Sequence, residues 1–279
     1  MDTVPIRELL RELNLRPSKA LGQHFLHDPK IVRRIADLAG LTREDLVVEI
    51  GPGLGVLTRE LAARAGKVIA IELDARLADY LRRQFASTNV EIVHGDALAV
   101  DYAGLTEERP YQVVANLPYS VATAIIERLL TGEHPPERLV VMVQREVAER
   151  LAAHPPDMTL LSVAAQFYAT PRIAFRIGAG AFVPPPKVES AVILLERREE
   201  TPLPRAEHAR FFRVVRAGFA QRRKRLANAL AAGLGLPKED VEAALVAAGI
   251  DPGRRAETLT LEEWLKLYQA LRERVHDAG

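Results

Sequence analysis

The amino-acid sequence predicts an α/β domain with a mostly parallel sheet, followed by a small all-helical domain. Short apolar runs alternate with helical patterns over the first two-thirds of the chain, which is typical of successive βαβ units. Hydrophobic residues make up 48% of the 279 residues, enough to bury a large core. After Glu196 the strand-like runs end and only helical patterns remain.

The composition excludes several classes of protein. With 27% charged and 5% aromatic residues and a net charge of +1, the chain is typical of soluble globular proteins. It has no cysteine, which excludes disulfides and thiolate metal sites, and we expect no bound metal. No apolar run approaches the roughly 18 residues of a membrane helix, and the first residues lack the apolar core of a signal peptide. We therefore expect a cytoplasmic protein that contacts no membrane and is monomeric by default.

Capping residues and apolar runs place the elements of the first domain. Asp28 followed by Pro29 predicts the start of a helix that runs to Gly40. Strands are expected over 46–50, 68–71, 90–93, 112–115 and 139–143, and helices from the glycine turn to about 65 and over 74–85, 121–130 and 145–153.

The end of the α/β domain is marked by a change of pattern. The segments 173–177 and 188–195 are expected to pair antiparallel around Pro184-Pro185-Pro186, and the segment that follows Glu196 has the composition of a linker. We therefore divide the chain into residues 1–199 and residues 200–279. Thr260 and Glu263 have the spacing of a capping box, which predicts the start of the last helix.

A glycine turn follows the first predicted strand. Gly51, Gly53 and Gly55 stand directly after Glu49-Ile50, and glycines at such a turn let a ligand approach the backbone closely. A single motif of this kind is weak, because tight strand-helix turns need glycine anyway. The third glycine comes two residues after the second, whereas the dinucleotide fingerprint has three. A nicotinamide-dependent dehydrogenase is therefore the less favoured alternative.

Two acidic residues end the next two strands. Glu72 lies about 20 residues beyond the glycine turn, where a carboxylate can accept hydrogen bonds from both ribose hydroxyls. Asp96 can accept from the exocyclic amine of an adenine ring. Carboxyl ends of parallel strands meet in one crevice, so the loop and both acids are expected to share a ligand. They resemble the cofactor site of class I S-adenosylmethionine methyltransferases. Glu49, Gly51, Gly53, Gly55, Glu72, Leu73, Asp96 and Ala97 are the cofactor candidates there.

A further motif, Asn116-Leu117-Pro118-Tyr119, follows the fourth predicted strand. By itself it reads equally well as a turn, since Asn and Pro favour turns. In this fold its atoms suit an amine substrate. The N6 amine of adenine is a poor nucleophile because its lone pair is delocalised. Two acceptors, the Asn116 side-chain oxygen and the Leu117 carbonyl, would accept hydrogen bonds from both N–H groups and localise the lone pair on N6. Tyr119 can stack on a base that has left its helix.

Five longer segments, together with these motifs, resemble the small-subunit ribosomal RNA adenine dimethyltransferases over nearly the whole chain. They are residues 18–26, 144–150, 182–190, 219–224 and 255–259. The resemblance implies a Rossmann-like methyltransferase domain with a seven-stranded sheet covered by helices on both faces. It implies S-adenosylmethionine as cofactor, S-adenosylhomocysteine as product, and N6,N6-dimethylation of two adjacent adenosines near the 3′ end of 16S rRNA in an assembling 30S subunit. It also implies that Gln23, His24, Leu26 and Asn116 contact the cofactor. Asn116, Leu117, Pro118 and Tyr119 would form the pocket for the target base, and Phe182 would close the other face of that base.

Basic residues suggest where RNA binds. A run without acidic residues from His208 to Arg225 ends in the cationic cluster Arg222, Arg223, Lys224 and Arg225, which we expect to begin a helix. In the family the C-terminal domain helps to engage the ribosomal particle. Arg145, Arg150 and Lys187 are the candidate phosphate contacts outside this cluster.

Three alternatives stay open at this point. A large-subunit rRNA adenine methyltransferase of the macrolide-resistance type shares the cofactor loop and the target chemistry, although the proline block favours the small-subunit family. A non-catalytic RNA-binding assembly or transcription factor on a methyltransferase scaffold would need neither Glu72 nor Asp96. A DNA adenine methyltransferase would carry a target-recognition domain, and the sequence shows none.

Overall fold

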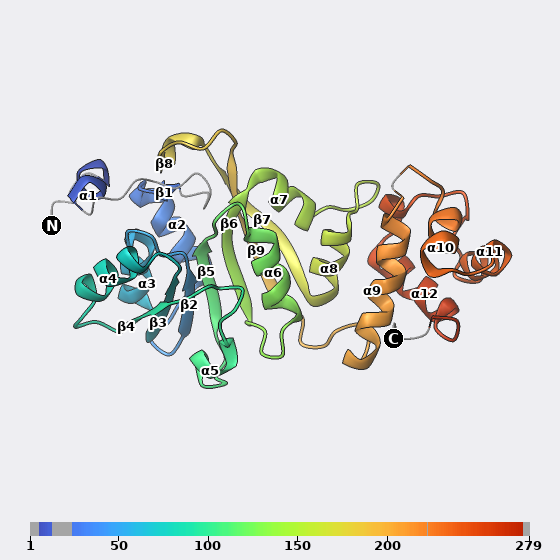
Figure 1. Ribbon diagram of the computed structural model, residues 1–279, viewed down its shortest axis with the longest axis horizontal. Coiled ribbons are helices and arrows are strands. Elements are labelled where there is room, and N and C mark those ends of the chain that lie inside the picture. The colour runs from blue at the N-terminus through green and yellow to red at the C-terminus, as the bar shows by residue number, and fades with distance from the viewer. Residues whose placement is uncertain (1–5, 13–23, 222, 276–279) are drawn as a thin grey trace. The chain divides into compact units, whose positions relative to one another are not determined.

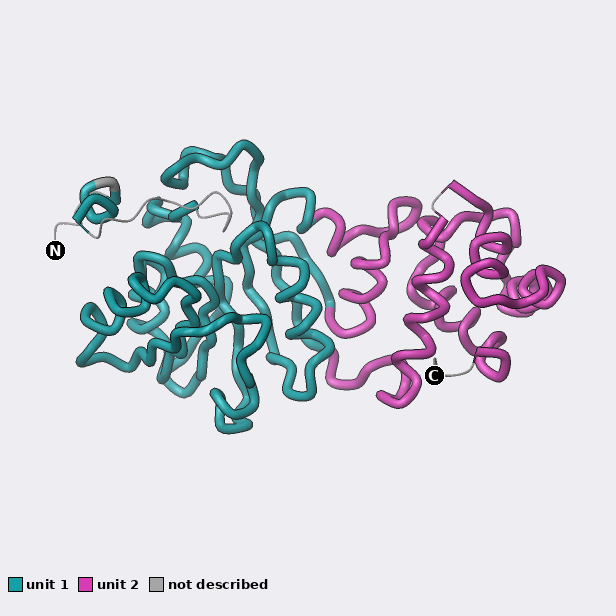
Figure 2. Tube along the Cα trace, viewed as in Figure 1, with its two compact units in different colours: residues 1–148, 170–197 teal, residues 149–169, 198–279 magenta. Residues whose placement is uncertain are grey.

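The computed structural model describes residues 6–12, 24–221 and 223–275. The chain forms two compact units (Figure 2), one of residues 1–148 and 170–197 and the other of residues 149–169 and 198–279. In the described part of the chain, none of the helices combines the length and apolar character needed to cross a bilayer.

The first unit contains a mostly parallel seven-stranded sheet (Figure 1), as predicted. The strand order is β4-β3-β2-β5-β6-β9-β7, with β6 and β9 antiparallel. The strands are β2 Leu46–Ile50, β3 Lys67–Glu72, β4 Val90–His94, β5 Gln112–Asn116, β6 Arg138–Gln144, β7 Ala169–Ile177 and β9 Ser190–Arg197. Consecutive residues of the central strands β2, β5 and β6 are buried, so both faces of the sheet are covered, as parallel sheets require.

Helices in this unit begin and end where local residues satisfy the free backbone groups. In α2, Asp28 Oδ1 accepts the Lys30 amide at 2.8 Å, Pro29 fills the first position and Gly40 closes the helix at φ +63°. The helices are α1 Ile6–Glu12, α2 Pro29–Ala39, α3 Val56–Arg64, α4 Ala75–Gln84, α5 Tyr102–Thr106 and α6 Ala122–Thr131, and α7 Arg145–Leu151 spans the boundary between the units.

A second, two-stranded sheet decides how the site is assembled. Strand β1, Phe25–Leu26, pairs antiparallel with β8, Phe182–Val183, directly after the 3₁₀ turn Ala179–Ala181. The sequence analysis did not predict this pairing, because two-residue strands carry no periodicity. It places His24 beside the proline block.

The second unit is helical, and its boundary differs from the one predicted. Residues 149–169 were assigned by sequence to the first domain, but they cluster with the C-terminal helices. The reason is packing: Phe167 on α8 is fully buried, with ring centroids 5.0 Å from Phe211 and 5.2 Å from Phe212. The elements of this unit are α8 Leu160–Tyr168, α9 Arg205–Phe219, α10 Leu226–Leu234, α11 Lys238–Ala247, a 3₁₀ turn Ala256–Thr258 and α12 Leu261–Leu271.

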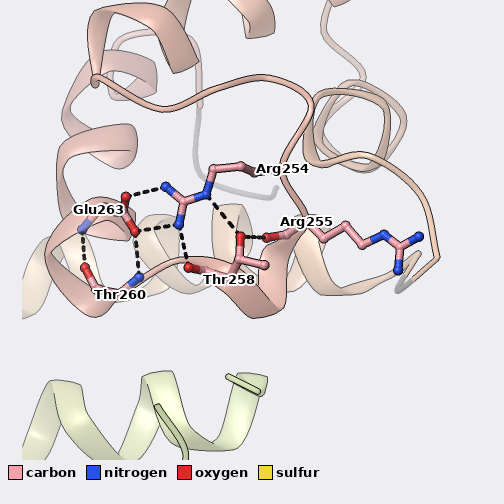
Figure 3. Close-up of polar contacts among 5 residues, drawn as sticks. All are labelled: Arg254, Arg255, Thr258, Thr260 and Glu263. Carbon is pink, nitrogen blue, oxygen red and sulfur yellow. Dashed lines mark hydrogen bonds and ion pairs between the residues drawn. The ribbon is translucent and has the colours of Figure 1, made fainter. Parts of the chain in front are cut away.

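The cationic cluster does not begin a helix, contrary to the prediction. Residues 223–225 lie in the connection between α9 and α10, and Leu226 is the first helical residue. The Leu226 amide donates to the Arg254 carbonyl. The Arg254 guanidinium in turn donates to Glu263 and to Thr258 (Figure 3). Glu263 completes the predicted capping box with Thr260.

Candidate active site

A cavity in the first unit opens at the carboxyl ends of β2, β3, β4 and β5. These strands are parallel, so the loops that follow them meet at one edge of the sheet. The predicted residues that line this cavity are His24, Leu26, Glu49, Gly51, Gly53, Glu72, Leu73, Asp96, Ala97, Asn116, Leu117, Pro118 and Tyr119.

The glycine turn needs glycine for two different reasons. At Gly53 φ is +58°, and a Cβ there would lie 3.1 Å from the Phe25 ring. A side chain at this position would therefore be strained and would displace the Phe25 ring slightly. Gly55 lies outside the cavity lining: it precedes α3 at φ +77°, and a Cβ there would meet Leu81 and Phe85 at 2.9 Å. Gly53 lets the turn lie close to Phe25, whereas Gly55 lets the turn pack on α4.

Two carboxyl groups are buried in this cavity. Glu49 is 1% exposed, and its Oε2 has no hydrogen-bond partner among the described residues. Burial raises the pKa of Glu49 to about 8, and the nearby Glu72 carboxylate adds to the rise. Burial also raises the pKa of Glu72, against the lowering effect of the amides that it accepts from Asp74 at 2.9 Å and Gly53 at 3.1 Å. Buried acids with perturbed pKa values in a cleft indicate a binding site.

Asp96 differs from these two acids because it is exposed. Its Oδ1 accepts the Leu98 amide at 2.8 Å, which fixes the turn after β4. Leu98 and the half-exposed Leu73 also line the cavity. A carboxylate beside apolar side chains suits a flat heterocycle that carries an amine.

The Asn116 side chain has a defined orientation. Its Nδ2 donates to the His24 carbonyl at 3.2 Å. A carbonyl oxygen can only accept, so the nitrogen of the amide must face it and Oδ1 is the atom turned elsewhere. The Leu117 amide donates to Met142 O at 3.1 Å, and the Val121 amide donates to Pro118 O at 3.2 Å, which holds the loop on the sheet. Asn116 therefore presents an acceptor from a fixed position.

Tyr119 is held from two sides. Its hydroxyl shares a hydrogen bond of 2.5 Å with Ser190 Oγ, and its ring stacks on the His24 ring at 5.5 Å between centroids. Burial raises the pKa of the Tyr119 hydroxyl, so this group stays neutral.

Known proteins resemble this chain over most of its length. A family model described as ribosomal RNA adenine dimethylase matches residues 14–273. The chain belongs to this family. Ribosomal RNA small subunit methyltransferase A of Dehalococcoides mccartyi is 45% identical over 263 residues, covering 94% of this chain and 90% of that protein.

Two solved structures show the same fold over most of the chain. The 23S rRNA methyltransferase ErmE is 33% identical with a TM-score of 0.73, covering 89% of this chain and 99% of that one. A dimethyladenosine transferase from Plasmodium falciparum is 25% identical with a TM-score of 0.78, covering 90% and 98%. The predicted family and the class I methyltransferase fold are confirmed.

Not every predicted residue of this dimethylase lies at the cavity. Phe182 is 2% exposed and is not part of the lining, because it lies in a hydrophobic core cluster that also contains Val114 and Val140. Gln23 lies outside the described residues. Conversely, the sequence analysis missed Phe25, Leu98 and Ser190. Phe25 stands inside the recognised segment 18–26, Ser190 is the last residue of the recognised segment 182–190, and Leu98 comes two residues after Asp96.

The basic candidates are spread over both units of the dimethylase. Lys187 is exposed in the loop before β9, and Arg145 forms an ion pair of 2.6 Å with Glu189. Arg150 is exposed in the second unit, as are Arg223, Lys224 and Arg225, while Arg222 lies outside the described residues. No cluster of metal-ligating side chains is found in the described ranges.

Proposed function

We propose that the chain transfers methyl groups from S-adenosylmethionine to N6 of two adjacent adenosines near the 3′ end of 16S rRNA, giving N6,N6-dimethyladenosine. One observation carries the proposal: the Asn-Leu-Pro-Tyr loop shares a cavity with the glycine turn, Glu72 and Asp96. A nucleoside cofactor and an acceptor base would thus meet in one place. The curated relative from Dehalococcoides, named for the small subunit, supports this choice of ribosomal RNA.

The residues of the cavity fit this cofactor. Glu72 accepts one amide on each carboxylate oxygen and keeps lone pairs for the ribose hydroxyls. Asp96 would accept from the adenine amine, between Leu73 and Leu98. The unpartnered Oε2 of Glu49 would gain a partner from the ammonium group of the methionine part. The bound cofactor supplies a methyl group on a sulfonium, which departs as a neutral thioether.

Asn116 and its loop act on the acceptor base. The Oδ1 of Asn116 and the Leu117 carbonyl would accept both N–H bonds of the adenine N6 amine and localise its lone pair. Tyr119 stacks on the base, which is worth about 1–3 kcal/mol. In direct in-line transfer the N6 lone pair forms the new C–N bond as the methyl–sulfur bond breaks, and the methylated nitrogen then loses one proton to water. The reaction depends mainly on holding the two reactants in line, so neither a covalent enzyme intermediate nor a strong general base is required.

The setting of the reaction belongs to the same proposal. We infer that the substrate is 16S rRNA within an assembling small subunit, bound in the cytoplasm by a monomer. The exposed Arg223, Lys224 and Arg225 support RNA binding, because phosphate neutralisation releases counterions.

A second candidate function is methylation of large-subunit RNA. The 33% identity to ErmE favours it, but the 45% identity to the small-subunit relative outweighs that likeness. Methyl transfer from labelled S-adenosylmethionine, offered to undermethylated small subunits and to large subunits, decides between them. Label in N6,N6-dimethyladenosine of 16S rRNA supports the proposal, and label on large-subunit RNA alone overturns it.

Asn116→Ala tests the assigned chemistry. We expect a loss of about 100-fold or more in the rate of transfer, comparable to the removal of one preorganised polar group in other active sites. Cofactor affinity, measured by calorimetry, should change little. Asn228→Ala, at an exposed position of α10, is the matched control and should keep the wild-type rate. Equal turnover by Asn116→Ala and wild type would contradict the role of Asn116.

A further inference from the structure

His24 joins three segments that are far apart in the sequence. Its ring nitrogen Nδ1 lies 2.8 Å from the Pro184 carbonyl, which can only accept, so Nδ1 carries the hydrogen. Its ring stacks on Tyr119, with an angle of 29° between the planes. Its backbone carbonyl accepts the Asn116 amide group. One residue therefore touches both the loop that would hold the target base and the proline block.

The side chain of His24 faces the base-holding loop through these contacts. The resemblance to the family implies that His24 contacts the cofactor, and His24 lines the cavity. Its Nδ1 bonds to the Pro184 carbonyl, and one face of its ring is covered by Tyr119. The backbone of His24, through its carbonyl, sets which end of the Asn116 amide faces the acceptor amine.

Ser190 holds the opposite end of Tyr119. It is fully buried at the start of β9, where it stands opposite Gln144 of β6 in the sheet register. Its backbone is thus fixed by the central sheet, and its Oγ lies 2.5 Å from the Tyr119 hydroxyl. A buried hydroxyl needs a partner, and Tyr119 supplies it. The orientation of the Tyr119 side chain is therefore fixed by two contacts, the hydrogen bond of its hydroxyl with Ser190 and the stacking of its ring on His24.

We propose that His24 and Ser190 are positioning residues for the target adenine, which set the plane of Tyr119 on which the base stacks. The proposal rests on the proposed function, since it concerns the acceptor base of that reaction. Stacking is productive only if the base plane brings N6 in line with the methyl group, so a tilted Tyr119 lowers the rate of transfer more than it lowers binding. Neither residue needs to touch the reacting atoms.

Variants of His24 separate its two contacts. His24→Asn keeps a donor for Pro184 and removes the ring, whereas His24→Phe keeps a ring and removes the donor. We expect each to lower the single-turnover rate about threefold to tenfold, the range of one aromatic pair or one hydrogen bond. Cofactor affinity is measured beside the rate, and the positioning role requires that the rate fall by a larger factor than the affinity. His27→Asn is the matched control, since the His27 ring bonds to the Gly180 carbonyl, and it should keep the wild-type rate.

A double-mutant cycle tests the hydroxyl pair. Ser190→Ala and Tyr119→Phe should each lower the rate about fivefold, and the double variant should lower it about fivefold as well, because one hydrogen bond is lost in all three. Melting temperatures establish that each variant is folded. If Ser190→Ala does not fold, Tyr119→Phe and the two His24 variants still decide the question.

The possible results separate the positioning role of His24 and Ser190 from the proposed methyl transfer to 16S rRNA. Wild-type rates for His24→Asn, His24→Phe and Tyr119→Phe, or effects that multiply in the double variant, overturn the positioning role while the proposed function stands. Wild-type protein that methylates only large-subunit RNA overturns the proposed substrate, and the same rate ratios on that RNA decide the positioning role. Wild-type protein that transfers no methyl group to either RNA overturns both.

Discussion

Replacing the buried acid Glu49 by glutamine should make the protein more stable, by an amount that depends on pH. The pKa of Glu49 is about 8 in the folded protein, against an ordinary value of 4.5. Between these values the folded state retains a proton that the unfolded chain has released, so stability falls as the pH rises. Glutamine is neutral throughout and avoids this loss. For a pKa shift of this size, the free energy of unfolding that wild type loses and the glutamine variant keeps is about 5 kcal/mol above pH 8. It is about 3 kcal/mol at pH 7 and less than about 1 kcal/mol at pH 5.

Urea denaturation of the cofactor-free protein between pH 5 and pH 9 measures this difference. The free energy of unfolding of Glu49→Gln minus that of wild type should be small at pH 5 and should grow until about pH 8. Glu91→Gln is the control, because Glu91 is half exposed and its ion pair with Lys67 is worth at most about 1 kcal/mol. A difference that does not change with pH would refute the burial argument.

The same variant should bind the cofactor more weakly. Oε2 of Glu49 is the unpartnered acceptor in the cavity, and glutamine replaces the carboxylate by a neutral amide. The loss of a charge-assisted hydrogen bond is worth about 1.5–3 kcal/mol, or roughly 10-fold to 150-fold in affinity. Calorimetry at pH 8.5, where wild-type Glu49 is largely ionised, measures it. Stability gained and affinity lost in one variant would mark Glu49 as a residue kept for binding.

Three further predictions concern the RNA surface and the scaffold. Neutralising Arg222, Arg223 and Lys224 together should reduce the slope of log affinity against log salt by about 2 to 3 for undermethylated subunits, and an unchanged slope would place the RNA surface elsewhere. Gly53→Ala should destabilise the protein by about 1–2 kcal/mol in urea denaturation, because alanine is strained at φ +58° and crowds Phe25; wild-type stability would show that the turn relaxes. Arg254→Ala should lower the stability by about 1–3 kcal/mol, since Glu263 loses its charged partner, and Arg254→Lys should recover part of it; an equal loss in both variants would contradict that account.

Much of the fold follows from short-range patterns in the sequence. Apolar runs predicted the central strands, and caps such as Asp28 and the Thr260–Glu263 box predicted helix starts to within a residue. These patterns are readable because a strand or a cap depends on a few neighbouring residues. Parallel strand order then brings the loops at Gly51, Glu72 and Asp96 to one edge, so the sequence could predict that these residues share one cavity.

The tertiary structure alone decided how distant segments meet. Nothing near His24 in the sequence indicates that it pairs with Pro184, 160 residues away, or that Tyr119 bonds to Ser190. The burial that shifts the pKa of Glu49 is likewise a property of packing from several elements. Residues 149–169 joined the second unit because Phe167 fits an aromatic cluster there. Such contacts depend on the shapes of side chains brought together by the whole fold, and no window of neighbouring residues encodes them.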